Sequence, residues 1–166
     1  SVSPVTDETL QNPDPGDWLN WRRTLDGWGY STLDQVDRSN VGALRLVWSW
    51  GLDSGRSQTT PLVHDGVMYI ANPGNVVQAL DARNGNFVWE YRPQPALEES
   101  LRAYSQTRNL AIYEDLIILN TADAHILGLD ARTGDVRWDT TIMPGQQGYG
   151  FSSGSMLPER IRRRRV

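Results

Sequence analysis

The chain has 166 residues, a hydrophobic content of 39% and a formal net charge of −4, which is enough apolar material for a hydrophobic core. Cysteine is absent, so disulfides and thiolate metal sites are excluded, and no apolar run approaches the length of a membrane span. The acidic body of the chain argues against nucleic acid as its main partner.

Residues 1–50 are expected to form an irregular lead-in. After it, short apolar runs alternate with turn residues, which is typical of a small antiparallel sheet and not of helices. Asp65-Gly66 and Asn84-Gly85 are expected as two-residue hairpin turns, because Asn, Asp and Gly tolerate the positive φ that such turns require. The expected strands are residues 62–63, 67–70, 76–80 and 87–91.

The same pattern returns 49 residues later. Residues 62–89 align without a gap on residues 111–138, and six of the ten residues that end each copy are identical. Glu114-Asp115 and Thr133-Gly134 fall at the turn positions of the second copy. A chance similarity between two ordinary hairpins is the alternative. A fixed period of this size, with four strands in each unit, is typical of a β-propeller.

The length of the chain conflicts with this architecture. A propeller needs at least about four blades to close a ring, so we expect an all-β, partial β-propeller that is a fragment of a longer protein. Each copy ends on a tryptophan, Trp89 or Trp138, and we expect both to lie at equivalent positions and to pack between neighbouring sheets. The expected divisions are the lead-in with a ring-closing strand (1–50), a first blade (51–92), an inter-blade loop with the second blade (93–142), and the start of a third blade that runs into an Arg-rich tail (143–166).

The C-terminal end differs in composition from the rest of the chain. Residues 159–166 contain one Glu and five Arg, a net charge of +4, so residues 1–158 sum to −8. The arginines stand where a third repeat calls for an apolar strand, and buried unpaired guanidinium groups are costly. We therefore expect residues 155–166 to be exposed and outside the native blade. An altered reading frame, a solvated natural tail and a nucleic-acid-binding tail stay open as explanations.

Several stretches resemble one family. The end of each repeat, Ala79 to Trp89 and Gly128 to Trp138, is similar to the tryptophan-docking pattern Ala-x-Asp-x-x-Thr-Gly-x-x-x-Trp of quinoprotein propellers. The lead-in from Asp17 to Trp48 and the segment from Thr60 to Tyr69 resemble the mature N-terminus and first blade of pyrroloquinoline quinone-dependent alcohol dehydrogenases of the methanol/ethanol type. Non-catalytic propellers share the docking pattern, whereas the lead-in is much more specific.

The resemblance implies an eight-bladed propeller that holds pyrroloquinoline quinone (PQQ) and a calcium or lanthanide ion on its axis. In that family an alcohol loses two electrons and two protons, and a c-type cytochrome reoxidises the cofactor. The implied partners of the full-length protein are an alcohol substrate and cytochrome c, with no nucleic acid and no membrane span. The implied location is the periplasm, with the signal peptide removed or outside this chain.

Three residues match positions that contact the cofactor in the family. Gln58 falls at a glutamate that hydrogen-bonds the quinone, and its alternative is a solvated loop residue. Arg108 matches an arginine that binds a quinone carboxylate, a role that suits the guanidinium fork, and its alternative is a surface ion pair. Ser152 falls where a threonine hydroxyl meets another quinone carboxylate, close to the Arg-rich tail.

The sequence also departs from the family. In the family, an adjacent cysteine pair lies against the quinone, and it would fall near Arg102-Ala103, but both cysteines are missing here. Their absence favours a divergent branch or a propeller that no longer oxidises anything. The family's metal ligands, aspartate base and haem motif come after Gly154, so no catalytic or metal residue is assigned here. His64 and His125 lack metal-ligand spacing and are expected to be structural, and Glu98-Glu99 is expected in a solvated loop.

We interpret the chain as part of a quinoprotein dehydrogenase that oxidises alcohols as the full-length protein and is inactive alone. The alternative is a non-catalytic propeller of the same repeat family that serves as an assembly scaffold. The lead-in and Arg108 favour the enzyme. A full gene without the later Glu, Asn and Asp residues would favour the scaffold.

Overall fold

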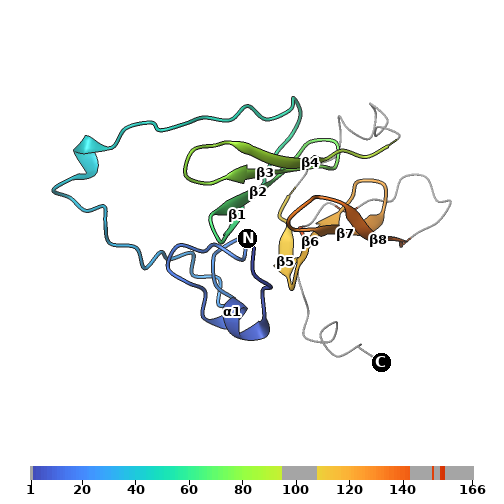
Figure 1. The fold of residues 1–166 in the computed structure, drawn as a ribbon, viewed down its shortest axis with the longest axis horizontal. Coiled ribbons are helices and arrows are strands. Elements are labelled where there is room, and N and C mark those ends of the chain that lie inside the picture. The colour runs from blue at the N-terminus through green and yellow to red at the C-terminus, as the bar shows by residue number, and fades with distance from the viewer. Residues whose placement is uncertain (1, 95–107, 143–150, 152–153, 156–166) are drawn as a thin grey trace.

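The computed structural model describes residues 2–94, 108–142, 151 and 154–155. Two four-stranded antiparallel sheets follow the N-terminal lead-in, and each sheet has its strands in chain order (Figure 1). The first sheet contains β1 (Leu62–His64), β2 (Val67–Asn72), β3 (Val76–Asp81) and β4 (Phe87–Tyr91). The second contains β5 (Ala111–Tyr113), β6 (Leu116–Asn120), β7 (His125–Asp130) and β8 (Val136–Thr141).

The repeat predicted from the sequence is confirmed strand by strand. Each strand of the second sheet begins 49 residues after its counterpart, from 62 and 111 for the first strands to 87 and 136 for the last. The registers also correspond, because Ala79 lies opposite Trp89 in the first sheet and Gly128 lies opposite Trp138 in the second. The two tryptophans therefore occupy equivalent positions, as expected.

The turn between β1 and β2 is the expected two-residue turn. Asp65 has φ 49° and Gly66 has φ 76°, so both residues adopt the positive values that primed turns require. The corresponding residue of the second sheet, Glu114, has φ 52°. The local chemistry of this turn was therefore readable from the sequence.

The connection between β3 and β4 differs from the expected two-residue hairpin at Asn84-Gly85. It spans residues 82–86, and Gly85 has φ 73° whereas Asn84 has no positive φ. The Asp81 carboxylate accepts a hydrogen bond from the Arg83 amide at 2.8 Å, and the Asp81 carbonyl accepts one from the Gly85 amide at 2.8 Å. The turn begins two residues earlier than predicted because this Asp side chain stabilises a longer loop.

The main core lies between the two sheets and is closed by the lead-in. β6 alternates between half-buried and buried residues, so it presents Ile117 and Leu119 to one face. β3 is buried at five of its six residues and its counterpart β7 at four, and β4 buries Trp89 whereas its counterpart β8 is exposed throughout. The first sheet is thus covered more fully than the second. The core includes Val5, Leu10, Leu19, Leu62, Tyr69, Val77, Trp89, Ile112, Ile117, Leu119, Leu127 and Leu129.

Trp89 joins the first sheet to the second. Its Nε1 donates a hydrogen bond to the Ala131 carbonyl at 3.1 Å, and its ring packs so closely on Gly134 that a Cβ there would lie 2.5 Å from it. Trp48 of the lead-in repeats this contact one blade earlier: its Nε1 donates to Ala82 at 3.2 Å, and its ring covers Gly85. The docking role predicted for Trp89 is confirmed.

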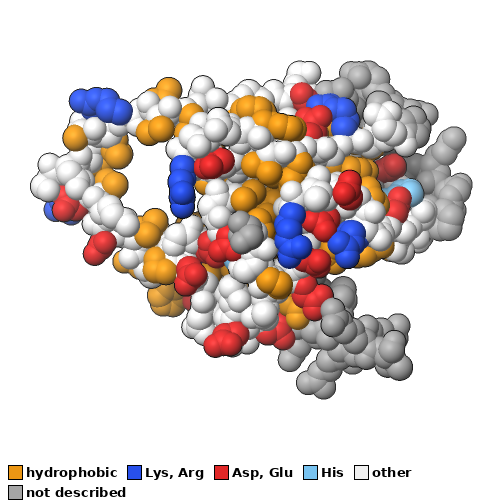
Figure 2. Space-filling view, in the orientation of Figure 1, with side chains coloured by type: hydrophobic (Ala, Val, Ile, Leu, Met, Phe, Trp, Pro, Cys, Tyr) orange, Lys and Arg blue, Asp and Glu red, His pale blue; other side chains and the backbone are white. Residues whose placement is uncertain are grey.

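The lead-in has little regular secondary structure and leaves the sheets as a wide loop (Figure 1). It contains the short helix α1 (Asp7–Gln11), which is capped by reciprocal hydrogen bonds between Thr6 and Thr9, and a 3₁₀ turn at Val41–Ala43. Large apolar side chains of the loop are exposed, among them Trp28 and Leu46, and Figure 2 shows an opening between the loop and the rest of the molecule. No helix in the described part of the chain is long and apolar enough to cross a membrane.

Candidate cofactor-binding site

The first strands of both sheets begin at the same end of the inter-sheet seam. The Thr60 amide, just before β1, donates a hydrogen bond to the Asn109 side-chain oxygen, just before β5, at 3.2 Å. Gln58 lies two residues before Thr60, and Arg108 is the neighbour of Asn109. The bond therefore holds the two segments that carry these candidate residues side by side.

A second side-chain link joins the sheets at the ends of β2 and β6. Asn75 donates through Nδ2 to the Asp123 carboxylate at 3.1 Å and accepts from the Ala122 amide at 3.0 Å. Asn75 is buried and has φ 62°, and Ala124, its counterpart 49 residues later, has φ 65°. The two turns thus share a conformation and are bonded to each other across the seam.

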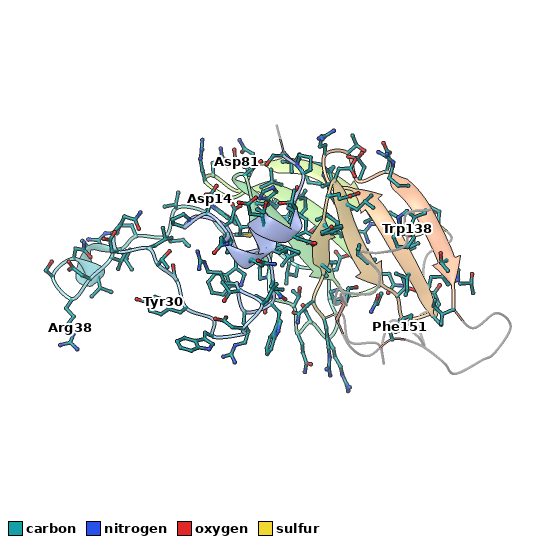
Figure 3. All side chains as sticks on the ribbon, turned by 90° about the horizontal axis from the view of Figure 1, so that it is seen from below. Asp14, Tyr30, Arg38, Asp81, Trp138 and Phe151 are labelled. Carbon is teal, nitrogen blue, oxygen red and sulfur yellow. The ribbon has the colours of Figure 1, made fainter. Side chains whose placement is uncertain are left out.

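A third segment of the chain also reaches this end. The Ser155 amide donates to the Asn109 carbonyl at 3.0 Å, and Gly154 lies so close that a Cβ there would be 2.7 Å from the Asn109 Cβ. Phe151 donates from its amide to the Thr121 carbonyl at 3.3 Å, and Figure 3 shows it beside the second sheet. Asn109 therefore contacts both the segment at Thr60 and the segment at Gly154 and Ser155.

Two of the three predicted cofactor residues can be placed. Gln58 and Arg108 are both exposed, on the adjacent segments just described. Ser152 lies outside the described residues, although its neighbours at 151 and 154 are at this end of the seam. Arg102-Ala103 and Glu98-Glu99 also lie outside the described part.

The expectation of an exposed tail from residue 155 onward is wrong at its first residue. Ser155 is buried, and its amide donates a hydrogen bond to the Asn109 carbonyl just before β5. Residues 156–166 are outside the described part of the chain.

A polar network fixes the segment that leads to Gln58. Gln78 accepts from Trp50 Nε1 at 2.9 Å and donates to the Glu90 carboxylate at 2.7 Å. Arg92 then bridges Glu90 and Asp53, with contacts of 2.9 and 3.0 Å. Hydrogen bonds from Arg92 lower the pKa of Glu90, so the carboxylate stays charged at neutral pH. Residues 50–53 are thus joined to the first sheet by the Trp50–Gln78 hydrogen bond and the Asp53–Arg92 salt bridge.

Each of the two histidines lies against a carboxylate. His64 is buried against Asp17, with 2.7 Å between Nδ1 and a carboxylate oxygen, and His125 lies 2.7 Å from Asp139. Within the described residues, no group of three His, Cys, Asp or Glu side chains is placed to hold a metal ion. These positions agree with the structural roles expected for both histidines.

An open cavity of about 340 Å³ lies between the lead-in and the first sheet. Its lining is largely apolar and includes Trp18, Leu33, Val63 and Met68. Such a lining suits the packing of apolar side chains better than the binding of a polycarboxylate. The exposed guanidinium and amide groups at the end of the seam fit an anionic, oxygen-rich ligand better.

Sequence reasoning missed the residues that assemble this end of the molecule. Asn109 is the neighbour of Arg108 in the sequence, and nothing in its local pattern indicates a contact with residue 60. Asn75 follows Gly74 between two apolar runs, which is a turn signal. That signal predicts the turn but not its bond to the neighbouring sheet.

The chain matches the family model described as "Glucose/ethanol/alcohol dehydrogenase, beta-propeller domain" over residues 18–140. It is 36% identical over 151 residues to the dehydrogenase subunit of a quinone alcohol dehydrogenase from Gluconacetobacter polyoxogenes, covering 88% of this chain and 20% of that protein. It is 37% identical over 131 residues to a 1-butanol dehydrogenase (cytochrome c) from Thauera butanivorans, covering 77% of this chain and 19% of that protein.

A solved structure agrees with these matches. The quinohemoprotein alcohol dehydrogenase ADHIIG of Pseudomonas putida HK5 superposes with a TM-score of 0.84 at 30% identity, covering 96% of this chain and 24% of that protein. The two sheets are accordingly consecutive blades of a partial β-propeller. This chain spans about a fifth of the length of the curated relatives it matches. The chain belongs to the glucose/ethanol/alcohol dehydrogenase β-propeller family.

Proposed function

We propose that the full-length protein containing this chain is a PQQ-dependent dehydrogenase that oxidises alcohols, and that residues 1–166 alone are inactive. The observation that carries the proposal is the junction at Asn109, which places Arg108 beside the segment of Gln58 at one end of the seam. The relatives named as quinone alcohol dehydrogenases support the same activity.

Arg108 would bind a carboxylate of the quinone, because its planar fork can donate two parallel hydrogen bonds. Gln58, on the segment beside that of Arg108, would donate a hydrogen bond to the quinone or accept one from it. Its amide does not carry the charge of a glutamate. Ser152 would add a hydroxyl donor to a second carboxylate. When bound, the quinone supplies the two-electron redox chemistry. The calcium or lanthanide ion would be held by ligands outside this chain.

The proposed substrate is an alcohol and the proposed electron acceptor is a cytochrome c. The relative named as a 1-butanol dehydrogenase (cytochrome c) supports both assignments. A periplasmic location is proposed with them. The particular alcohol depends on parts of the protein beyond this chain.

We also propose that residues 44–50 form the outer strand of the blade that closes the ring. Trp48 supports this role, because it contacts Ala82 and Gly85 of the first blade as Trp89 contacts Ala131 and Gly134 of the second. The remaining proposed divisions are a first blade over 51–92, a second over 93–142 with its preceding loop, and the start of a third over 143–166.

The test of the cofactor assignment is the substitution Arg108→Ala in the full-length protein. Losing a charge-assisted hydrogen bond should weaken equilibrium PQQ binding by about 1–3 kcal/mol, measured by fluorescence titration of the apoprotein. Arg83→Ala is the matched control, because Arg83 is an exposed arginine of the β3–β4 loop at the opposite end of the first sheet. Equal affinities for the two variants would return Arg108 to the role of a surface ion-pair residue.

The activity itself is tested by dye-linked oxidation of short primary alcohols after reconstitution with PQQ and calcium. The full-length protein should be active and purified residues 1–166 should not, because two blades leave sheet faces and strand edges uncovered. Activity of the isolated chain would contradict the proposal. Failure of the full-length protein both to bind PQQ and to oxidise alcohols would favour the scaffold alternative.

A further inference from the structure

His64 is buried, and both of its ring nitrogens face hydrogen-bond acceptors. Nδ1 lies 2.7 Å from the Asp17 carboxylate, and Nε2 lies 2.9 Å from the Ser3 backbone carbonyl. A carboxylate and a carbonyl can only accept, and a neutral imidazole carries a single N–H. The neutral ring could therefore satisfy one of these contacts but not both.

The Ser3 hydroxyl does not resolve this conflict. It lies 3.4 Å from His64 Nε2 but only 2.7 Å from the Asp65 carboxylate, so its proton is directed to Asp65. With a neutral ring protonated at Nδ1, the lone pair of Nε2 would face the lone pairs of the Ser3 carbonyl in a buried position. Two N–H groups on the ring satisfy all the contacts.

The charges around the ring favour a cation. Asp17 is bonded to Nδ1 and also accepts from the Asp65 amide at 3.2 Å, while the Asp65 carboxylate is 3.7 Å from Nε2. Hydrogen bonds from the Ser3 hydroxyl and amide lower the pKa of Asp65, so this carboxylate is charged beside the ring. Two carboxylates thus face one imidazole. Arg132 of the second sheet is the cation bonded to the same segment, through the Val2 carbonyl at 3.3 Å.

The same contacts hold residues 2–5, the N-terminal segment, across the seam between the two sheets. Ser3 is bonded to Asp65 of the first sheet's turn through its amide and hydroxyl, both at 2.7 Å. Val5 is fully buried and exchanges two backbone hydrogen bonds with Glu114 of the second sheet, at 2.8 and 2.7 Å. The segment therefore contacts both blades, and His64 is bonded to its middle.

We propose that His64 is doubly protonated in the folded protein and that its charge fastens the N-terminal segment to the seam as a pH-sensitive latch. Loss of one proton as the pH rises leaves Nε2 facing the Ser3 carbonyl without a donor. The segment then detaches from His64, and the Val5–Glu114 pairing opens. At lower pH the latch is closed.

The protonation state is read directly from the ring nitrogens by ¹⁵N NMR of the full-length protein at about pH 7. His64 should show both nitrogens protonated, and its signal is assigned by its loss in His64→Gln. His125 is the internal comparison, because its side chain is partly exposed and its Nδ1 contacts the Asp139 carboxylate. A neutral tautomer of His64 with one unprotonated nitrogen would overturn the proposal.

The latch is read from the hydrogen-exchange protection of the Val5 and Glu114 amides between about pH 6 and pH 9, corrected for intrinsic exchange. Their protection should fall at least about tenfold with rising pH, a change of about 1.4 kcal/mol, while that of β6 stays constant. His64→Gln should give low protection without a pH step. Ser3→Ala keeps the carbonyl acceptor and should keep the step. Constant protection in the unsubstituted protein would reject the latch.

Discussion

Trp89 and Trp138 occupy the same register in two repeats, yet their surroundings differ. Trp89 is 6% exposed and is bonded to Ala131 of the next blade, whereas Trp138 is 37% exposed and lies against Gly128 of its own sheet. Figure 3 shows Trp138 on the second sheet, on the side away from Tyr30 and Arg38 of the lead-in. The repeat sequence sets the position of each tryptophan, but only a neighbouring blade gives it a partner.

The largest expected effect separates these two side chains directly. Trp89→Ala should destabilise the described fold by about 3–5 kcal/mol, because it opens a cavity in the core between the blades. Trp138→Ala should cost less than about 1.5 kcal/mol in this chain, since the ring is already over a third exposed. Urea unfolding of residues 1–166 and the two variants, followed by tryptophan fluorescence and circular dichroism, measures the difference. Equal losses would contradict the docking role of Trp89.

A second substitution tests the surface on which Trp89 packs. Gly134→Ala adds a Cβ that would lie 2.5 Å from the ring, at a residue with φ 78°. Gly66→Ala is a matched control, because Gly66 has φ 76° and nothing lies within 4 Å of its Cβ position. Each substitution should lower the free energy of unfolding by about 1 kcal/mol, because alanine is strained in the left-handed backbone. Gly134→Ala should lower it by about 1–3 kcal/mol more, because its Cβ clashes with the Trp89 ring.

The measurement is again the free energy of unfolding from urea titration. The difference between the two glycine variants isolates the contact with Trp89 from backbone strain. If Gly134→Ala and Gly66→Ala lose the same stability, the close packing of Trp89 on this loop does not hold the blades together.

A smaller effect concerns the carbonyl that Trp89 uses. Tyr69 also donates to the Ala131 carbonyl, at 3.0 Å, and its ring centre is 5.9 Å from that of Trp89. Burial raises the pKa of Tyr69, so its hydroxyl keeps the proton that it donates throughout the neutral range. Tyr69→Phe should cost about 0.5–1.5 kcal/mol. Tyr30→Phe, at an exposed tyrosine of the lead-in, should be neutral in the same urea unfolding assay.

The smallest effect is on the pH dependence of the docking loop. Burial raises the pKa of Asp130, but hydrogen bonds from the Arg132 and Thr133 amides and from Arg137 outweigh it and lower the pKa overall. A carboxyl whose pKa is lowered by folding stabilises the fold above its unfolded value of about 3.9, and this stabilisation disappears as the pH falls through the folded value.

We therefore expect stability to fall below about pH 4 and the fall to be shallower in Asp130→Asn. Thermal unfolding at several pH values measures both slopes. Asp34→Asn, in the exposed lead-in loop, is the control and should leave the slope unchanged. An identical acid slope in Asp130→Asn and the unsubstituted chain would exclude Asp130 as a contributor.

The repeat made most of the fold predictable. Alternating apolar residues and the 49-residue offset specify strand positions and register, because a one-residue slip would turn every core side chain outward. The β3–β4 loop was mispredicted because the Asn-Gly pair is a hairpin signal, whereas the Asp81 side chain starts the turn earlier.

The candidate site was less predictable for a physical reason. Arg108 and Gln58 were found by resemblance, but the bond between Thr60 and Asn109 that brings their segments together joins residues 49 apart. Such contacts depend on how two blades pack and leave no local pattern. The charge environment of His64 likewise depends on residues 3 and 17, which are distant from it in the chain.

The docking of each tryptophan on the following loop also sets an order of assembly. The contact of Trp48 joins residues 34 positions apart, and that of Trp89 joins residues 42 positions apart. During synthesis, each blade can therefore acquire its neighbour soon after the next loop leaves the ribosome, without waiting for distant parts of the chain. Until that loop arrives, the newest tryptophan stays uncovered. Every growing molecule thus passes through stages at which one blade end is open to chaperones or to another nascent chain.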